Sequence, residues 1–535
     1  MSGPPEQRAR SRGAPRLRRA RRRRGAWGPC RGPRSSARDP EERHGSAGAR
    51  RRQGAWGPCR GPRSSARDPE ERHGSAGARR RRGAWGPCRG PHEIVIQSTW
   101  SRGSGGGVAV ASGPRRRRRR GPSRSRPRER RMTIDWARCH TRPVLMIPGP
   151  TELPPPVIQA LNQPPAIQYD ETFDEGVLEP TTLALREVFQ TRHEVIVMPG
   201  SGRTALEAGA LSVIEPGDRA LVVAAGQFGL LMREIMHRVG AELTEFPVEL
   251  GAPLDLDRLA AEARRLRPKV LSLVHNETST GTTYPAAEVG RIAREVGALF
   301  LLDTVSSIAG IDVRTDEWGV DLNMTGSQKC LAAPLGMALV AVSPRAWEAM
   351  ERRARPARSW AYDLLRWKEH WIPESRGGRV KDGAPRRQPV SIPTHLTAAM
   401  QVAVRLILEE GLPHRFRRHE VAARALRAGV AAMGLEMFPH PSLLSSTVSS
   451  IKAPRDVDTA AVVRRMREQY GILIGTGLDR IRATTLRIGT MGMTASPLYV
   501  LPTLGALELA LRDLGYKAEP GAGVAAAQRV FADHT

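Results

Sequence analysis

The sequence predicts an α/β fold with a mostly parallel sheet covered by helices, followed by a smaller α+β domain. Short apolar runs alternate with amphipathic segments of ten or more residues from about Leu145 to Pro393, a pattern typical of parallel sheets that are covered on both faces. After Pro393 the periodic segments are longer and the strands are few. We therefore expect a large domain over residues 132–395 and a small domain over residues 396–535.

The predicted elements follow from the period of the apolar residues. Five apolar runs predict strands at Glu194–Met198, Ala220–Ala224, Val270–Val274, Leu299–Leu302 and Met337–Val342. Amphipathic segments between them predict helices at Thr204–Val213, Leu230–Val239, Leu256–Leu266 and Ala286–Val296. In the small domain, helices are expected at Leu396–Glu410, Arg415–Met433, Thr459–Tyr470, Leu498–Leu514 and Val524–Ala532, with three short strands.

Residues 1–131 differ from the rest of the chain in composition. They contain 38 Arg, no Lys and 9 acidic residues, so they carry nearly all of the formal net charge of +30. The segment GAWGPCRGP recurs at Gly25, Gly54 and Gly83, and apolar side chains are scarce between the copies. Because so little apolar surface could be buried, we expect this Arg/Gly/Pro-rich tail to be disordered.

Three interpretations of the tail are open. Its Arg clusters could bind nucleic acid by neutralising phosphates, or it could be a targeting segment. Alternatively, translation begins at Met132 and the upstream stretch is an artefact of the gene model. Because the remaining residues are close to neutral, the total charge does not make the whole protein a nucleic-acid binder.

The cysteines and the apolar runs restrict the location of the protein. Three of the five cysteines are copies of one repeat, which leaves Cys139 and Cys330, so neither a disulfide framework nor a CxxC metal pair is present. No run of 18 apolar residues predicts a membrane-spanning helix. We expect a cytoplasmic protein that binds no metal.

Three loops that follow predicted strands contain residues suited to chemistry. Residues 199–204 read PGSGRT and lead directly into a helix, where small residues and the helix N-terminus favour an anion. Asp303 stands where an apolar strand ends, and Lys329 follows another apolar stretch. The chain has only six Lys against 78 Arg, which suggests that position 329 needs an amine able to lose its proton.

These groups match the needs of pyridoxal 5'-phosphate. Its phosphate requires an anion site, its ring nitrogen a carboxylate, and its aldehyde an amine for a Schiff base. In an α/β sheet the loops at the carboxyl ends of the strands meet at one edge. The sequence therefore predicts a site for this cofactor.

Five motifs, in order and spacing, resemble class V pyridoxal-phosphate aminotransferases of the alanine–glyoxylate and serine–pyruvate group. The motifs are SGRTALEA, HNETSTG, LLDTVSS, GSQKC and LRIGTMG, and the resemblance extends from about Val144 to Leu514. It implies the fold-type I architecture of these transferases. Similarity to ureidoglycine–glyoxylate and pyridoxamine–pyruvate aminotransferases is also present.

The resemblance implies a role for each matching residue. Lys329 would bind the cofactor covalently and then act as the general base, and Asp303 would pair with the ring nitrogen. The other cofactor-binding positions would be Ser201, Gly202, Arg203, Phe228, Thr278, Val305, Gln328 and Ser391. Phe228 departs from the Trp common in alanine–glyoxylate enzymes. His275 and Glu277 are interpreted as loop scaffolding.

Substrate and subunit contacts are implied in the same way. Arg487 would bind the substrate carboxylate as a planar fork, and Gly149 belongs to a turn at the mouth of the site. The family is dimeric with shared sites, so Ser391 would reach the neighbouring subunit's cofactor. Gln388 stands where a Tyr is expected, and the basic segment 372–387 is unassigned.

The predicted function is transfer of an amino group from a small amino acid, of alanine or serine type, to glyoxylate or pyruvate. The alternatives within the family are ureidoglycine–glyoxylate and pyridoxamine–pyruvate transamination. A cysteine desulfurase would need a mobile-loop Cys, whereas Cys330 directly follows Lys329. A different class of function, nucleic-acid binding, would depend on the Arg tail alone.

Overall fold

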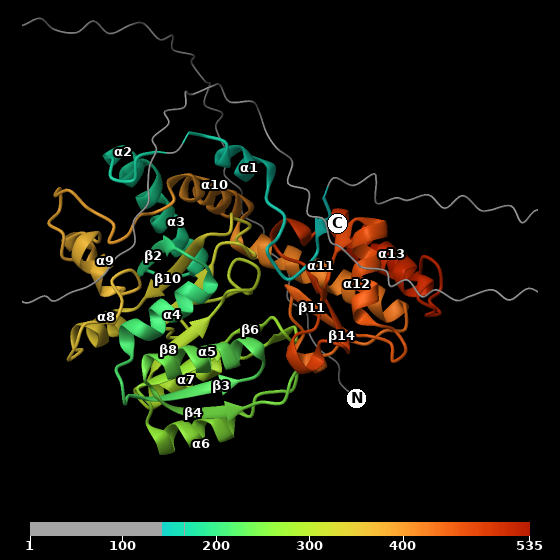
Figure 1. Ribbon diagram of the computed structural model, residues 1–535, viewed down its shortest axis with the longest axis horizontal. Helices are drawn as coiled ribbons and strands as arrows, with labels where there is room; N and C mark the ends of the chain where they lie inside the picture. The colour runs from blue at the N-terminus through green and yellow to red at the C-terminus, as the bar shows by residue number, and fades with distance from the viewer. Residues whose placement is uncertain (1–141, 165, 535) are drawn as a thin grey trace, which may run out of the picture. The chain divides into compact units, whose positions relative to one another are not determined.

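The computed structural model describes residues 142–164 and 166–534. The tail, with its predicted disorder and possible binding of nucleic acid, lies outside these residues. A seven-stranded sheet forms the centre of the larger core (Figure 1). Its spatial order is β2 (Glu194–Pro199), β10 (Met337–Val342), β9 (Leu322–Gly326), β8 (Leu299–Asp303), β5 (Val270–Val274), β3 (Arg219–Ala224) and β4 (Glu242–Pro247).

Strand direction confirms the predicted parallel sheet with one exception. β9, β8, β5, β3 and β4 pair in parallel, whereas β10 is antiparallel to both of its neighbours. Every residue of β5, β8, β9 and β10 is buried, as expected for strands covered on both faces. Their carboxyl ends, β10 excepted, therefore point to one edge of the sheet.

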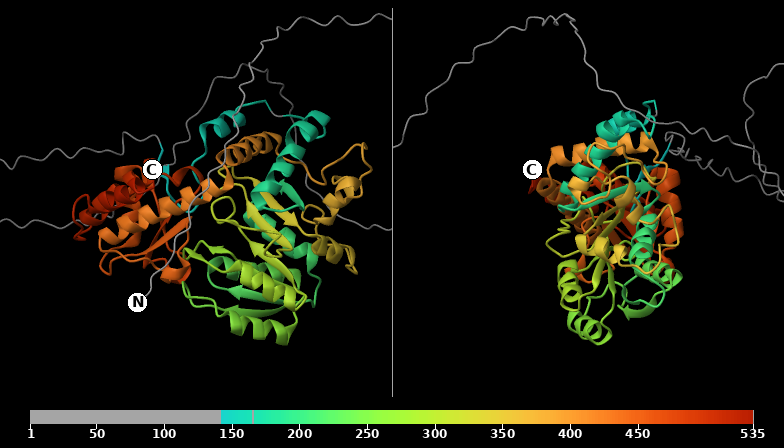
Figure 2. Two further views of the ribbon diagram at one scale, coloured as in Figure 1. Left: turned by 180° about the vertical axis from the view of Figure 1, so that it is seen from behind. Right: turned by 90° about the vertical axis from the view of Figure 1, so that its left-hand side faces the viewer.

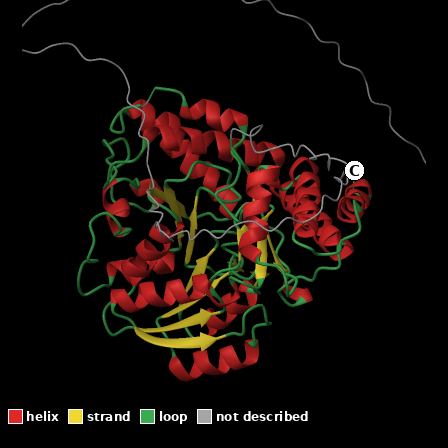
Figure 3. Ribbon diagram, turned by 45° about the vertical axis from the view of Figure 1, so that its right-hand side comes forward, coloured by secondary structure: helices red, strands yellow, loops and turns green. Residues whose placement is uncertain are grey.

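Helices cover both faces of this sheet (Figure 3). α4 (Gly202–Val213) and α5 (Gln227–Val239) pack against each other, and so do α6 (Leu256–Leu266) and α7 (Ala286–Glu295). The remaining helices of this part are α1 (Pro155–Leu161), α2 (Glu171–Phe173), α3 (Glu179–Phe189), α8 (Pro344–Glu351), α9 (Leu365–His370) and α10 (Thr394–Glu410). A π-helical turn, Asp174–Leu178, joins α2 to α3, and a 3-10 turn occupies Glu374–Arg376.

A second core surrounds a small antiparallel sheet of order β11 (Val448–Lys452), β14 (Thr485–Gly489) and β13 (Gly475–Thr476). Its helices are α11 (Leu412–Ala432), α12 (Thr459–Tyr470), α13 (Pro497–Asp513) and α14 (Ala522–Ala532). These elements lie together beside the large sheet when the molecule is viewed from behind (Figure 2). Short two-stranded pairs join β1 (Val144–Leu145) to β12 (Ile472–Leu473) and β6 (Asn276–Glu277) to β7 (Thr282–Thr283).

The predicted division at residues 395 and 396 remains a prediction, and two packing facts bear on it. Met146, next to β1, belongs to the second core, although it precedes the large sheet in sequence. Helix α10 follows the predicted boundary, yet its buried face, including Met400 and Ile407, packs in the first core. The chain therefore passes from the second core to the first at its start and returns after Glu410.

All predicted helices and strands form within a few residues of their expected bounds, but β4 and β9 were not among the predicted strands. β4 is an edge strand whose polar side chains leave it half exposed. β9 contains Asn323 and Thr325, which are fully buried. Asn323 donates to Thr315 Oγ1 at 2.8 Å and accepts from Thr304 Oγ1 at 2.5 Å, so hydrogen bonds compensate its burial. Within the described residues, no helix is long and apolar enough to cross a membrane.

Replacing a leucine at the centre of the sheet should destabilise the protein strongly. Leu301 lies in β8 and is fully buried, so Leu301→Ala should lower the free energy of unfolding by about 2–5 kcal/mol through lost burial and the remaining cavity. Urea denaturation followed by circular dichroism would measure this loss.

Leu509→Ala is the matched control, since Leu509 on α13 is 46% exposed. This surface change should alter the free energy of unfolding by less than about 0.5 kcal/mol. Equal losses in the two variants would contradict the central position of β8.

Candidate active site

A cavity of about 490 Å³ opens at the edge of the sheet where β2, β5, β8 and β9 end. Eleven of the predicted site residues line it, and they come from seven separate segments. These residues are Gly149, Ser201, Gly202, Arg203, Phe228, Thr278, Asp303, Val305, Gln328, Lys329 and Arg487. The cavity is large enough for a small ligand and shows the usual mixture of apolar walls and a few polar groups.

The start of α4 forms one end of the cavity. Ser201 caps the helix, and its amide donates to Thr204 Oγ1 at 3.1 Å. The first amides of a helix have no intrahelical partner and attract an anion. Gly202 is needed here because a Cβ at this position would overlap the side chain of Val305.

Gln328 faces the same cavity. Its Oε1 atom is buried and has no hydrogen-bond partner among the described residues. A buried amide oxygen without a partner is costly, which indicates that a ligand completes its hydrogen bonds.

Lys329 lies in the turn after β9 and is largely buried. Its Nζ donates to the carbonyl of Pro148, and a Cβ on Gly149 would overlap its side chain. Burial lowers the pKa of Lys329 to about 8, and the positive charge of Arg487 acts in the same direction. A substantial fraction of the amine is therefore neutral near physiological pH.

Asp303, at the end of the adjacent strand β8, is 4% exposed. The amide of Val305 donates to its Oδ1 at 2.8 Å, and within residues 142–164 and 166–534 this is the carboxylate's only hydrogen bond. Burial, with a smaller contribution from the charge of Glu277, raises its pKa to about 7. A cationic partner in the cavity would reverse this shift.

Arg487 comes from β14 of the small sheet and is 9% exposed. Its Nε donates to the carbonyl of Thr476 at 2.8 Å, and its Nη1 donates to that of Thr278 at 3.1 Å. These bonds fix the plane of the guanidinium and leave other donors of the fork for a carboxylate. Burial lowers the pKa of Arg487 to about 10, so it remains charged.

Glu277 supports this arrangement from behind. Its buried carboxylate accepts from the amides of Phe228, Gly229 and Ser279, each at 3.1 Å, and from Ser279 Oγ at 2.5 Å. It therefore caps the N-terminus of α5 and holds the loop that carries Thr278. Burial raises its pKa, although these hydrogen bonds oppose the shift.

The comparisons with known proteins agree with this geometry. The family model described as aminotransferase class-V matches residues 145–357. An uncharacterised aminotransferase of Methanocaldococcus jannaschii is 34% identical over 389 residues, which covers 72% of this chain and 97% of that protein. The (S)-ureidoglycine–glyoxylate transaminase of Bacillus subtilis is 33% identical over 412 residues, which covers 74% of this chain and 96% of that protein.

A solved structure shows the same likeness. The pyridoxamine–pyruvate aminotransferase from Mesorhizobium loti superposes with a TM-score of 0.69 at 29% identity, covering 74% of this chain and 99% of that one. The chain belongs to the class-V aminotransferases. It is thus a transaminase, and its cofactor is pyridoxal 5'-phosphate.

The cavity of this class-V aminotransferase fits the cofactor on its own chemistry. It contains a helix N-terminus for a phosphate and a desolvated carboxylate at Asp303 for the ring nitrogen. Lys329 follows β9, the neighbour of the strand that ends at Asp303. These groups are those that the cofactor's phosphate, ring nitrogen and aldehyde require.

Ser391 is the one predicted site residue that the cavity of this aminotransferase does not include. It is exposed, and its Oγ accepts from Gln168 Nε2 at 3.0 Å. Residues not singled out from the sequence also line the cavity, among them Asn276, Leu335 and Leu478. Asn276 stands inside the motif HNETSTG, so that motif was the available signal; Leu335 and Leu478 carried none.

The cofactor-free aminotransferase should lose stability as pH rises because of Asp303. Its folded pKa, about 7, exceeds the usual 3.8, so its contribution is fully present below the lower value and is lost as pH rises through the upper one. The side chain of the Asp303→Asn variant cannot ionise. As pH rises between these two values, the free energy of unfolding of the variant should therefore increase relative to that of the wild type. Urea unfolding at a series of pH values measures this difference.

Asp257→Asn, at an exposed position on α6, is the matched control and should follow the wild type. A wild-type minus D303N difference that does not change with pH would show that the carboxylate is not desolvated.

Proposed function

We propose that this aminotransferase moves an amino group from a small amino acid, of alanine or serine type, to glyoxylate or pyruvate. The observation that carries the proposal is the meeting of Lys329, Asp303 and Arg487 in one cavity, where an amine, an acid and a carboxylate-binding fork line the same space. Transamination needs these three functions: covalent attachment, charge stabilisation at the ring nitrogen, and binding of the substrate carboxylate.

The cofactor would be held at three points. Ser201, Gly202 and Arg203 would bind its phosphate at the start of α4, with Gln328 as a side-chain partner. Asp303 would bind the ring nitrogen, while Val305 and Phe228 would contact the two faces of the ring. Thr278, whose Oγ1 donates to Ser306 Oγ at 2.8 Å, would lie near the ring's phenolic oxygen.

When bound, the cofactor supplies an electron sink for the charge that develops on the substrate's α-carbon. Lys329 is the group that can move the proton at that carbon. Because its pKa is about 8, the neutral amine is accessible near neutral pH, which a general base requires. Asp303, once paired with a cation, stays ionised and keeps the ring nitrogen protonated.

The dimensions of the cavity favour a small substrate. The 490 Å³ must hold the cofactor as well as the substrate, and the walls of the cavity include the apolar residues Ile147, Leu335 and Leu478. Two of the relatives named above, from Bacillus subtilis and Mesorhizobium loti, act by their names with glyoxylate or with pyruvate. Ureidoglycine–glyoxylate and pyridoxamine–pyruvate transamination are therefore the alternative reactions.

We further propose that two copies form a homodimer with shared active sites in the cytoplasm. Ser391 supports this assembly because it is exposed and does not line its own chain's cavity, so it would serve the cofactor of a second copy. The basic segment 372–387 has no assigned role in this proposal.

Lys329→Ala should abolish the visible absorption band of the bound cofactor, because among the described residues that line the cavity no other is a lysine. The wild-type protein, mixed separately with alanine, serine, glycine, ureidoglycine and pyridoxamine, should react fastest with its natural donor. The measurement is the rate at which the visible band changes after mixing.

Lys368→Ala, which alters a lysine paired with Glu351 outside the cavity, is the control and should keep the band. If the wild type binds the cofactor but none of the five donors changes its spectrum, transamination of small amino donors is wrong.

Arg487→Lys should raise the KM for glyoxylate by about tenfold to a hundredfold, because a lysine ammonium replaces a planar fork that binds a carboxylate through two hydrogen bonds. Steady-state kinetics against pyruvate and glyoxylate would measure the change. Arg482→Lys, at an exposed position near the same strand, is the control. An unchanged KM would mean that another group binds the carboxylate.

A further inference from the structure

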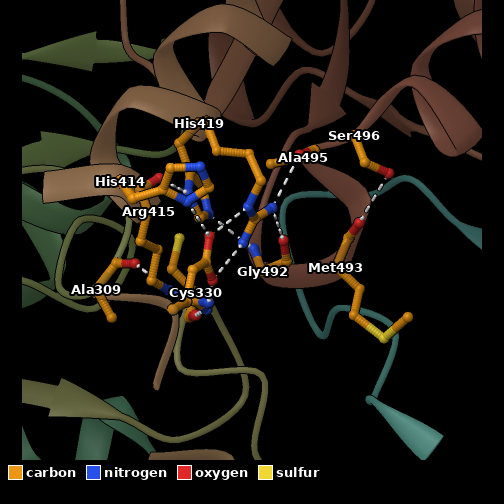
Figure 4. Close-up of polar contacts among 11 residues, drawn as sticks. Ala309, Cys330, His414, Arg415, His419, Gly492, Met493, Ala495 and Ser496 are labelled. Carbon is orange, nitrogen blue, oxygen red and sulfur yellow. Dashed lines mark hydrogen bonds and ion pairs between the residues drawn. The ribbon is translucent and has the colours of Figure 1, made fainter. Parts of the chain in front are cut away.

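A partly buried ionic cluster lies behind Lys329, outside the cavity. Glu410 ends α10, and Arg415, Arg418 and His419 stand in the first turns of α11. Arg415 and His419 lie beside Cys330 and Gly492 (Figure 4). None of these four residues lines the active-site cavity. The cluster nevertheless contacts the backbone of every loop that carries a proposed catalytic or substrate-binding residue from β8, β9 and β14.

Arg415 binds the two loops of the large sheet. It is 5% exposed, and its Nη2 donates to the carbonyl of Cys330 at 2.5 Å. Its Nε donates to the carbonyl of Ala309 at 2.8 Å, in the loop that begins at Asp303. Because Cys330 directly follows Lys329, one side chain fixes the backbone beside the amine and the loop that follows the acid.

The backbone in both loops is held in an unfavourable conformation. Ala309 has φ of 62° and Ala332 has φ of 51°, the left-handed region that alanine rarely adopts. Such residues persist only where surrounding contacts impose them. The hydrogen bond from Arg415 to Ala309 is one such contact.

Arg418 instead contacts the segment that follows the last strand of the small sheet. Its Nη1 donates to the carbonyls of Gly492 at 2.8 Å and Ala495 at 2.9 Å, in the segment that follows β14 and Arg487. His419 holds the same segment, since its Nε2 accepts from the amide of Gly492 at 3.0 Å. Burial lowers the pKa of His419 well below its usual value, so the neutral ring donates from Nδ1 to the carbonyl of Arg415.

Glu410 joins the two arginines. Its Oε2 accepts from Arg415 Nη1 at 2.6 Å, and its Oε1 accepts from Arg418 Nε at 2.6 Å. Burial alone would raise its pKa, but the two guanidinium groups lower it to about 2, so the carboxylate stays charged. Glu410 is also the last residue of α10, which packs in the first core, whereas the following helix α11 packs in the second core. Glu410 therefore lies where the chain crosses from one core to the other.

We propose that Glu410, Arg415 and Arg418 form a positioning triad that aligns Lys329 with Arg487. Arg415 fixes the backbone next to Lys329 and the loop that follows Asp303. Arg418 fixes the segment that follows Arg487, and Glu410 holds the two arginine side chains in position relative to each other. None of the three lines the cavity, so they would act only through other residues. The inference rests on the proposed roles of Lys329 and Arg487.

The two arms of the triad make different predictions about the reaction. Arg415→Lys keeps the charge but loses the fork that holds both carbonyls, so Lys329 should shift. Its kcat should fall by about tenfold to a hundredfold, the pH midpoint of the visible band should move, and the KM for glyoxylate should change little. Arg418→Lys should instead raise the KM for glyoxylate and leave that midpoint in place.

The experiment uses the full chain loaded with pyridoxal 5'-phosphate, with pH titration of the visible band, steady-state kinetics against glyoxylate, and thermal unfolding. Arg417→Lys is the matched control, since Arg417 stands between the two on α11 and forms an exposed ion pair with Glu420. It should match the wild type in all three measurements.

Two results would overturn the proposal. One is that R415K and R418K match R417K in kinetics and in the pH midpoint. The other is that both lose activity only in proportion to the folded protein, with kcat per bound cofactor and KM unchanged, which a purely structural cluster predicts.

If either arginine variant does not fold, Glu410→Gln decides. It keeps the shape and part of the hydrogen bonding, and it should show a reduced kcat together with a raised KM. Folded E410Q with wild-type kinetics would also overturn the proposal. Failure of the proposed function is a separate result, because it would appear in the wild type as no spectral change with any amino donor.

Discussion

The burial of one amine and one carboxylate at neighbouring strand ends governs the rest of this structure. Burial penalises the charged form of each group, so it lowers the pKa of Lys329 and raises that of Asp303. Without the cofactor, the cavity therefore holds two ionisable groups whose pKa values are shifted from the usual ones because their charged forms are poorly solvated. A ligand that provides a cation for the acid and a carbonyl for the amine relieves both penalties, which explains why pyridoxal phosphate suits this site.

Maintaining those groups in place requires the two cores to act together. The lysine and the acid belong to the large sheet, whereas Arg487 belongs to the small one. Close backbone approach at Gly149 and Gly202 makes room for the side chains, and Glu277 caps the helix that presents Phe228. Behind the site, Glu410 and its two arginines connect the loops of both cores by hydrogen bonds to carbonyls. Precise alignment of this kind determines transamination rates because small displacements of reacting groups are expensive.

Much of the fold and of the site follows from local patterns. Strands β2, β5 and β10 are continuous apolar runs, and helices such as α6 and α12 have a clear period, so their bounds were predictable to within a few residues. β9 was harder to predict because its buried Asn323 is stabilised by partners that are distant in sequence or lie on other elements. β4 was missed because Phe246 is its only buried residue, so its sequence contains no apolar run.

The sequence by itself determined which residues have the chemistry. Lys329, Asp303 and the glycine-rich turn at residues 200–202 are identifiable because their types are unusual at strand ends, and Arg487 is identifiable because its motif resembles that of the family. Only the tertiary structure decided that eleven of the predicted residues share one cavity and that Ser391 does not. It also decided which buried partners support them, such as Glu277 and Arg415. The physical reason is that desolvation and hydrogen-bond geometry depend on packing between segments hundreds of residues apart, which no local pattern records.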